Sequence, residues 1–153
     1  MGVVHDASMA EGVATKTVLC IDDSEGHLKI LELSLAAHHY RVELAHDGHD
    51  ALTMLQSLTP DLIIVDVDMP FLDGLGFTAR VRRLKRFDAV PILVMTAVDR
   101  EDLLPRVAKA GADAILKKPV QGKNLGRIVA NVMRQGRNAE PVELRRGQLH
   151  IDD

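Results

Sequence analysis

Hydrophobic residues occur along the chain in two alternating patterns: short continuous runs, and positions repeated every three or four residues. Five short segments are apolar enough to be strands: residues 17–21, 41–45, 62–65, 91–95 and 114–116. The run Leu62-Ile63-Ile64-Val65 has no polar position at all. A continuous apolar run of this length, ending in polar and turn residues, is typical of a strand covered on both faces. The pattern therefore predicts a sheet with helices on both sides.

Between these runs, apolar residues recur at three- and four-residue spacing, which is typical of amphipathic helices. The marker positions are Leu28, Leu31, Leu35; Ala51, Leu52, Leu55; Phe77, Val81, Leu84; the segment 103–110; and Leu125, Ile128, Val129, Val132. The order is strand then helix, five times over. Such alternation predicts a parallel sheet with right-handed crossovers. We expect an α/β, doubly wound, flavodoxin-like fold with five parallel strands in the order 2-1-3-4-5 and five helices.

The chain divides into three parts. Residues 1–15 have no periodicity and predict a mobile N-terminal arm, and residues 16–135 predict one domain. Residues 136–153 are too few for a further domain, but VELRRGQLHID alternates as strands do. We interpret this last part as a C-terminal tail or as the start of a missing output domain.

Composition and charge narrow the class of protein. The net charge of −3 excludes a general attraction to nucleic acid or to an anionic membrane. No apolar run approaches the length of a membrane span, and the N-terminus lacks the layout of a secretory signal. The single cysteine, Cys20, is expected to be a small buried strand residue. These features predict a cytoplasmic protein without membrane contacts.

Polar side chains follow four of the predicted strands at the point where each strand ends. Asp22 and Asp23 follow the first strand, Asp66 the third, Thr96 the fourth and Lys118 the fifth. The carboxyl ends of parallel strands share one edge of the sheet, where open α/β sheets place their ligands. We therefore expect these five side chains to converge, with Asp66 at the centre.

This set of side chains suits one kind of chemistry. Three carboxylates held together repel one another, and a hard divalent cation such as Mg²⁺ relieves that repulsion. A hydroxyl and an ammonium beside them suit the oxygens of a transferring phosphoryl group. An aspartate can itself act as the nucleophile and form an acyl phosphate. The cofactor expected is Mg²⁺, for which Mn²⁺ can substitute.

Four motifs in order give the chain a family resemblance. They are IDDS, DVDMPFLDG, the MTA of residues 95–97 and the KKP of residues 117–119. With these, residues 16–135 resemble the receiver domain of two-component response regulators of the chemotaxis-protein type. The resemblance implies a phosphorylation-dependent signalling module rather than an enzyme.

The resemblance implies a role for each acidic residue. Asp66 would accept a phosphoryl group from a histidine kinase or a histidine phosphotransfer protein. Asp66 and Asp23 would bind the metal directly, Asp22 would bind it through water, and Asp68 would contribute its backbone carbonyl.

Further residues carry over, and at some positions the chain departs from the family pattern. The Thr96 hydroxyl and the Lys118 ammonium would each contact a phosphoryl oxygen, and a cis peptide would join Lys118 to Pro119. The family usually has an aromatic residue three positions before this lysine and another just after the Lys-Pro pair. This chain has Ile115 and Val120 there.

The expected output surface comprises the helix at 103–110, the strand at 114–116 and the last helix. Ile115 and Val120 would add apolar area to it, for an unknown downstream protein, an output domain or a second copy in a homodimer. We expect the Thr96 hydroxyl to carry the activation, and the helix containing Pro105 to be the element that moves. A nucleic-acid partner is expected only if an output domain is missing.

Two alternative interpretations compete with this one. Asp66-Val67-Asp68 resembles the DxD of haloacid-dehalogenase-like phosphatases, in which the first Asp is the nucleophile and the second a general acid. That motif normally follows the first strand of a longer chain, whereas here it follows the third. The basic residues suggest nucleic-acid binding, but we interpret them as the solvated face of the third helix, with Phe77, Val81 and Leu84 turned inward; they are Arg80, Arg82, Arg83, Lys85 and Arg86.

Overall fold

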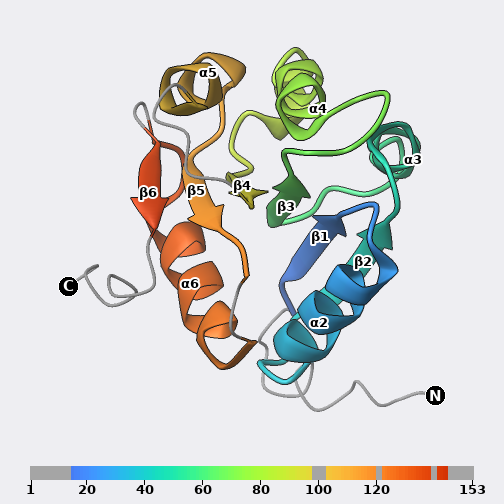
Figure 1. Cartoon of the computed structure of the whole chain (residues 1–153), viewed down its shortest axis with the longest axis vertical. Coiled ribbons are helices and arrows are strands. Elements are labelled where there is room, and N and C mark those ends of the chain that lie inside the picture. The colour runs from blue at the N-terminus through green and yellow to red at the C-terminus, as the bar shows by residue number, and fades with distance from the viewer. Residues whose placement is uncertain (1–14, 98–102, 120–121, 139–140, 145–153) are drawn as a thin grey trace.

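The computed structural model describes residues 15–97, 103–119, 122–138 and 141–144 (Figure 1). The strands are β1 (Thr17–Ile21), β2 (Arg41–Ala45), β3 (Leu62–Asp66), β4 (Ile92–Thr96), β5 (Ala114–Lys117) and β6 (Val142–Leu144). The helices are α2 (Glu25–Ala36), α3 (Gly48–Met54), α4 (Gly74–Val81), the 3-10 turn η1 (Lys85–Phe87), α5 (Leu103–Ala110) and α6 (Gly122–Gln135). The expected N-terminal arm lies, apart from Thr15, outside the described residues.

The strands form one parallel sheet in the order β2-β1-β3-β4-β5-β6. The first five strands confirm the expected order 2-1-3-4-5. The sixth strand differs from the expectation, because Val142–Leu144 pairs in parallel with β5 and extends the sheet beyond residue 135. The alternating pattern in the C-terminal segment therefore corresponds, at Val142–Leu144, to a strand of the same sheet.

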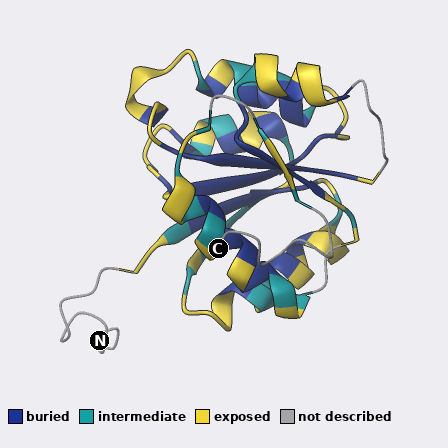
Figure 2. Cartoon of the chain, turned by 90° about the vertical axis from the view of Figure 1, so that its left-hand side faces the viewer, coloured by how far each residue is buried: buried dark blue, intermediate teal, exposed yellow. Residues whose placement is uncertain are grey.

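Helices cover both faces of this sheet (Figures 1 and 2). Helices α3, α4 and α5 lie on one face, and α2 and α6 lie on the other. Alternate residues of each strand point to opposite faces. In β1, Leu19 and Ile21 belong to the core beneath α3, α4 and α5, whereas Val18 and Cys20 belong to the core shared with α2 and α6. The strands β1, β3 and β4 are therefore apolar at nearly every position, because both faces of each are buried.

Side-chain caps start the helices that follow β1, β2 and β3. The Ser24 hydroxyl accepts a hydrogen bond from the His27 amide, and the Asp47 carboxylate accepts one from the Asp50 amide. Asp73 caps α4 in the same way through the Gly76 amide. These short polar residues satisfy amides that no helix carbonyl can reach. The caps fix where each chain segment turns away from the edge of the sheet that carries the polar residues.

Two expectations about the third helix are wrong. Phe77 and Val81 are buried, but Leu84 is 43% exposed, because α4 ends at Val81 and the chain continues into η1. The side chain of Arg82 is only 11% exposed and so does not belong to a solvated face. Its guanidinium donates hydrogen bonds to carbonyl oxygens of Phe87, Val90 and Gly111 and to Asp113.

Two further expectations concern buried residues. Cys20 is buried, as expected for a small strand residue. Ile115 is only 6% exposed and belongs to the core beneath α5, so the expectation that it adds apolar area to an output surface is wrong. Val120 lies outside the described residues. Among those that are described, no helix is long and apolar enough to cross a membrane.

Candidate functional site

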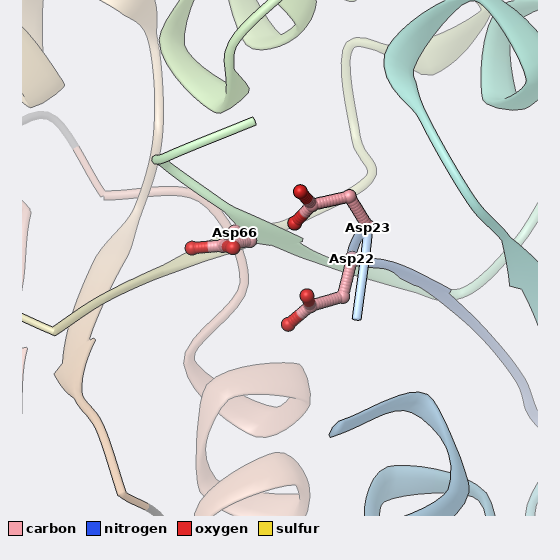
Figure 3. A group of neighbouring side chains, drawn as sticks. All are labelled: Asp22, Asp23 and Asp66. Carbon is pink, nitrogen blue, oxygen red and sulfur yellow. The ribbon is translucent and has the colours of Figure 1, made fainter. Parts of the chain in front are cut away.

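The predicted site residues meet at the carboxyl edge of the sheet. Asp22 and Asp23 follow β1, Asp66 ends β3, Thr96 ends β4, and Lys118 follows β5. One carboxylate oxygen from each of Asp22, Asp23 and Asp66 lies within 4.8 Å of the other two (Figure 3). The Lys118 ammonium lies 2.9 Å from Asp22 and 3.3 Å from Asp66. The convergence expected from the parallel sheet is therefore present.

Asp66 is nearly buried at the centre of this group, with 5% of its surface exposed. One of its carboxylate oxygens accepts a hydrogen bond of 3.2 Å from the Asp68 amide, and the other lies next to Lys118. Burial raises the pKa of Asp66, and the charge of Asp22 raises it further, against the opposing effects of Lys118 and the Asp68 amide. A raised pKa means that the charged form is held at a cost. Additional positive charge at this place would lower that cost.

Asp22 and Asp23 differ although they are adjacent. Asp22 is fully buried, and its two oxygens accept hydrogen bonds from the Ser24 amide at 2.9 Å and from Lys118 at 2.9 Å. Asp23 is exposed. The two carboxylates nevertheless approach the same space beside Asp66 (Figure 3). Asp23 therefore has the more accessible carboxylate for a cation arriving from solvent.

Lys118 connects β5 to the acidic cluster. Its peptide bond to Pro119 is cis, as the resemblance implied, and its amide donates a hydrogen bond of 2.7 Å to the Thr96 carbonyl. Burial by itself lowers the pKa of Lys118, but the hydrogen bond to Asp22 and the charges of Asp66 and Asp22 raise it overall. The side chain is therefore a cation that is held between two carboxylates.

Thr96 and Asp68 complete the predicted set. Thr96 is 3% exposed and is the last residue of β4, whose neighbouring residue Met95 pairs with Asp66. It therefore lies one strand away from Asp66, at the same edge. Asp68 is exposed and turns its amide toward the Asp66 carboxylate. The expected metal contact of its carbonyl remains a prediction.

His27 also belongs to this site, and the sequence analysis missed it. Its Nδ1 lies 3.0 Å from the Lys118 ammonium and 3.3 Å from Asp22. The signal was present in the chain: Ser24 caps α2 directly after the strand-end carboxylates, so the first turn of that helix has to face them. Spacing among the histidines alone could not reveal this placement.

Together these groups can bind a cation and an anion side by side. Three carboxylates form a group that could hold a metal ion. Thr96 ends β4 and Lys118 follows β5, and the Lys118 ammonium contacts both Asp66 and Asp22. Hard oxygen ligands suit Mg²⁺, which is usually bound by one or two carboxylates together with a phosphate. The arrangement therefore fits phosphoryl chemistry at Asp66 with a divalent cation beside it.

Comparison with known proteins supports the same interpretation. The family described as "Response regulator receiver domain" matches residues 18–130. The chain is 37% identical over 138 residues to the transcriptional regulatory protein AfsQ1 of Streptomyces coelicolor, covering 89% of this chain and 59% of that protein. It is 39% identical over 140 residues to the response regulator MprA of Mycobacterium avium, covering 88% and 60% respectively.

Solved structures agree with the sequence matches. The chemotaxis protein CheY4 of Vibrio cholerae superposes with a TM-score of 0.75 at 32% identity, covering 78% of this chain and 99% of that one. These matches give no support to the haloacid-dehalogenase-like alternative. The chain spans about 60% of the length of the curated relatives it matches. The chain belongs to the response regulator receiver family, as its four strand-end motifs, its fold and these matches all show.

Proposed function

We propose that Asp66 is the phosphoacceptor of this receiver and takes its phosphoryl group from a histidine kinase or a histidine phosphotransfer protein. The observation that carries the proposal is the position of its carboxylate. It lies at the end of a buried strand, among Asp22, Asp23 and Lys118. A carboxylate with two further acids and an ammonium beside it has partners for both a metal and a phosphoryl group.

The transfer uses one carboxylate oxygen of Asp66 as the nucleophile. A bond forms from this oxygen to phosphorus while the bond from phosphorus to the donor's histidine nitrogen breaks, and the nitrogen keeps the electron pair. The product is an acyl phosphate. Lys118 already lies 3.3 Å from the carboxylate, so its ammonium can follow the new negative charge. We assign the Thr96 hydroxyl a contact with another phosphoryl oxygen.

Mg²⁺, or Mn²⁺ in its place, is the cofactor we propose. Asp23 and Asp66 would hold the ion directly, Asp22 would hold it through water, and the Asp68 carbonyl would complete the protein ligands. The bound ion would offset the charge of the acids and of the incoming phosphoryl group. The support is the difference between Asp22, whose oxygens already accept two hydrogen bonds, and the exposed Asp23.

The output surface that we propose is formed by α5, β5 and α6. Every exposed charged side chain on the described residues of these elements is basic; they are Arg106, Lys109, Lys117, Lys123, Arg127 and Arg134. Two copies that met through this surface would bring like charges together, which disfavours the homodimer. We therefore propose a downstream protein or output domain with an acidic docking surface, in the cytoplasm. Nucleic acid would be a partner only of an output domain.

Activation is proposed to begin at Thr96 and to reach α5. The Thr96 side chain would move toward the phosphoryl group, and α5 would move in response; residues 98–102, between the two, lie outside the described residues. Pro105 lies in the first turn of α5 and removes one backbone donor there. Because Ile115 stands where the family usually has an aromatic residue, no aromatic ring at that position takes part. Beryllofluoride bound at Asp66 should change hydrogen exchange in α5, and unchanged exchange there would contradict this route.

The chain is proposed to be a switch and not an enzyme with turnover. A receiver labels itself once and releases phosphate slowly, whereas a phosphatase continues until its substrate is used up. Incubation with a large excess of acetyl phosphate should give about one acid-labile phosphate per chain, and inorganic phosphate should be released no faster than the labelled protein decays once the donor is removed. Release of inorganic phosphate many times faster than that decay would contradict this part of the proposal.

Substitution of Asp66 tests the acceptor directly. Asp66→Asn should abolish labelling by acetyl phosphate or by a phosphohistidine donor in the presence of Mg²⁺, because an amide cannot form the acyl phosphate. Asp68→Asn is the matched control: it removes a nearby carboxylate but keeps the backbone amide and carbonyl, so it should still be labelled. A folded Asp66→Asn chain that takes up a full equivalent of phosphate would overturn the assignment.

A further inference from the structure

The edge of β5 is occupied by residues from the C-terminal part of the chain. Val142–Leu144 forms β6 and pairs in parallel with 114–116 of β5. We call the described residues 137–138 and 141–144 the C-terminal strap. Figure 1 shows β6 beside β5, between the levels of α5 and α6. The strap therefore lies on the surface proposed above for the output.

The strap is held at its start by one buried carboxylate. Asp113, which is fully buried, accepts hydrogen bonds from the Arg137 guanidinium at 2.8 Å and from the Asn138 amide at 2.7 Å. Its backbone carbonyl accepts one from the Asn138 side chain at 3.2 Å and one from the Val142 amide at 3.0 Å. Arg137 also donates to the Asp88 carbonyl at 2.7 Å. The strap is thus fixed where β5 begins.

The strap contributes side chains as well as backbone. Leu144 is half-buried against the core shared by α2 and α6. Glu143, opposite Ile115, adds an exposed carboxylate to a surface whose other described exposed charges are cations. The strap therefore covers an unpaired sheet edge, shields apolar area and offsets basic charge. An unpaired strand edge is otherwise a place where another chain can add itself.

Asp113 also connects the strap to the phosphoacceptor site. Its carboxylate accepts a hydrogen bond from the Ile92 amide at the start of β4, in addition to that from Arg82 at the end of α4. Strands β4 and β5 lead from this point to Thr96 and Lys118. One end of β5 is therefore tied to the strap, and the other end carries the lysine of the site.

We propose that the C-terminal strap is an autoinhibitory contact, which closes the α5–β5–α6 surface in the unphosphorylated protein and is released when Asp66 is phosphorylated. The proposal rests on the proposed function of Asp66. In this structure Lys118 contacts Asp22 and Asp66 directly. To contact a phosphoryl group beyond Asp66, its ammonium would leave Asp22. The end of β5 would shift with Thr96, because the Lys118 amide donates a hydrogen bond to the Thr96 carbonyl.

The short pairing between β6 and β5 is the contact that breaks on phosphorylation. Strand β6 has three residues, and its start stays fixed to Asp113 through Arg137 and Asn138. It cannot follow a shift of the far end of β5 without breaking the pairing of Leu116 with Leu144. A three-residue edge strand has little to hold it once its register is disturbed. Release would open the β5 edge and its basic surroundings to an acidic partner.

The test compares two substitutions at one position in the full 153-residue chain. Val142→Pro removes the amide that donates to the Asp113 carbonyl, whereas Val142→Ala keeps it. Hydrogen exchange is followed in peptides from residues 113–117 and 141–144, with and without Mg²⁺ and beryllofluoride. Fluorine NMR of bound beryllofluoride gives its affinity independently.

Three results are expected. Beryllofluoride speeds exchange of the strap about tenfold in the unsubstituted chain, which corresponds to about 1.4 kcal/mol. Val142→Pro shows that fast exchange without beryllofluoride, and Val142→Ala does not. Because coupling between two sites is reciprocal, Val142→Pro also binds beryllofluoride about tenfold more tightly than Val142→Ala.

Other results would overturn the proposal. Unchanged strap exchange while beryllofluoride is bound would show that the strap is not coupled to Asp66. Equal protection in Val142→Pro and Val142→Ala would show that the ladder does not hold the strap. If beryllofluoride fails to bind at all, the proposed function of Asp66 fails with the coupling. In that case the comparison of the two variants without beryllofluoride still shows whether the ladder holds the strap.

Discussion

At the scale of single residues, the site keeps three acids together with one ammonium to offset them. Lys118 contacts Asp22 and Asp66, while Asp23 is exposed. Burial and the charge of Asp22 raise the pKa of Asp66, so the carboxylate gains from any additional cation. This imbalance gives the metal a physical role, because a single ammonium offsets only one of the three negative charges and a divalent cation would offset the other two.

Replacing Asp23 tests this role. Asp23→Asn removes one ligand charge, and ligand charge is a main determinant of affinity for hard cations. We expect the Mg²⁺ affinity measured by calorimetry to fall on the order of tenfold or more, about 1.4 kcal/mol per factor of ten. Labelling by acetyl phosphate should be lost with it at a fixed low Mg²⁺ concentration.

The control for this prediction is Asp88→Asn. Asp88 is an exposed acid after η1, so its substitution makes the same change of net charge away from the site. Its Mg²⁺ affinity should match that of the unsubstituted chain. An equal loss of Mg²⁺ affinity in Asp23→Asn and Asp88→Asn would mean that the change in net charge, and not the loss of a specific ligand, lowers the affinity. Full labelling in excess EDTA would remove the metal requirement altogether.

At the scale of elements, the end of β3 and the start of α4 are pressed together. A Cβ on Gly74 would lie 2.3 Å from the carbonyl oxygen of Asp66 and 2.9 Å from the Cα of Val67. The Gly74 amide also donates a hydrogen bond of 3.0 Å to the Val67 carbonyl. The contact is with backbone, which cannot rotate away as a side chain can. A glycine is thus needed here for close approach, and the position of the phosphoacceptor depends on it.

Gly74→Ala should therefore disturb both stability and the site. We expect the free energy of unfolding in urea to fall by about 1–3 kcal/mol, as for other overpacked positions. Labelling of Asp66 should slow because its carbonyl has to move. Gly26→Ala in α2 is the matched control, since its new Cβ would meet only the Ser24 hydroxyl at 3.8 Å. That variant should be neutral or more stable by up to about 1 kcal/mol.

A second link between elements is made by Arg82. Its guanidinium connects the end of α4 to three carbonyls and to the buried Asp113. Burial and the charge of Arg137 lower the pKa of Arg82 to about 10, which still leaves it protonated at neutral pH. The charged Arg82 side chain therefore holds α4, η1 and the segment before β5 together through its hydrogen bonds.

Arg82→Met should be costly although it keeps the apolar stem. It leaves carbonyl oxygens and part of the Asp113 charge without their donor, and we expect a loss of about 3 kcal/mol in the free energy of unfolding. Arg83→Met, at the exposed neighbouring position, should change it by less than about 0.5 kcal/mol. Similar urea midpoints for both variants would show that the hydrogen bonds of Arg82 contribute little to the free energy of unfolding.

At the scale of the whole molecule, one sheet carries two cores, and stability should be graded across it. Strands β3 and β4 are buried at every residue and lie between other strands. Strand β6 has exposed or half-buried residues and only one neighbour, β5. Backbone hydrogen bonds between two covered faces open only when much of the core opens.

Native-state hydrogen exchange measures this gradient. We expect the slowest exchange in β1, β3 and β4, which should approach the rate set by global unfolding, and the fastest in β6. The contrast between β4 and β6 serves as an internal control, because both lie in the same parallel sheet. Equal protection in β4 and β6 would contradict a weakly held edge strand.

The sequence by itself determined the first five strands, the helices between them and the residues at the strand ends. Apolar runs such as that of β3 are readable because burial on both faces leaves no polar position. The convergence of Asp22, Asp66 and Lys118 follows from parallel strands alone, since their carboxyl ends share an edge. The order of the strands followed from alternation and right-handed crossovers.

Tertiary structure decided the features that depend on contacts between distant segments. Arg82 stands in a run of basic residues, which predicts a solvated helix face. The fold instead places four hydrogen-bond acceptors around its guanidinium, and the long side chain reaches them. Ile115 belongs to the core beneath α5 and not to the outer surface, and the fold decides this because it places α5 over that face of β5. The alternation around Val142 predicted a strand but not its partner. Only the unpaired edge of β5 and the buried Asp113 carboxylate decide that this strand joins the receiver's own sheet.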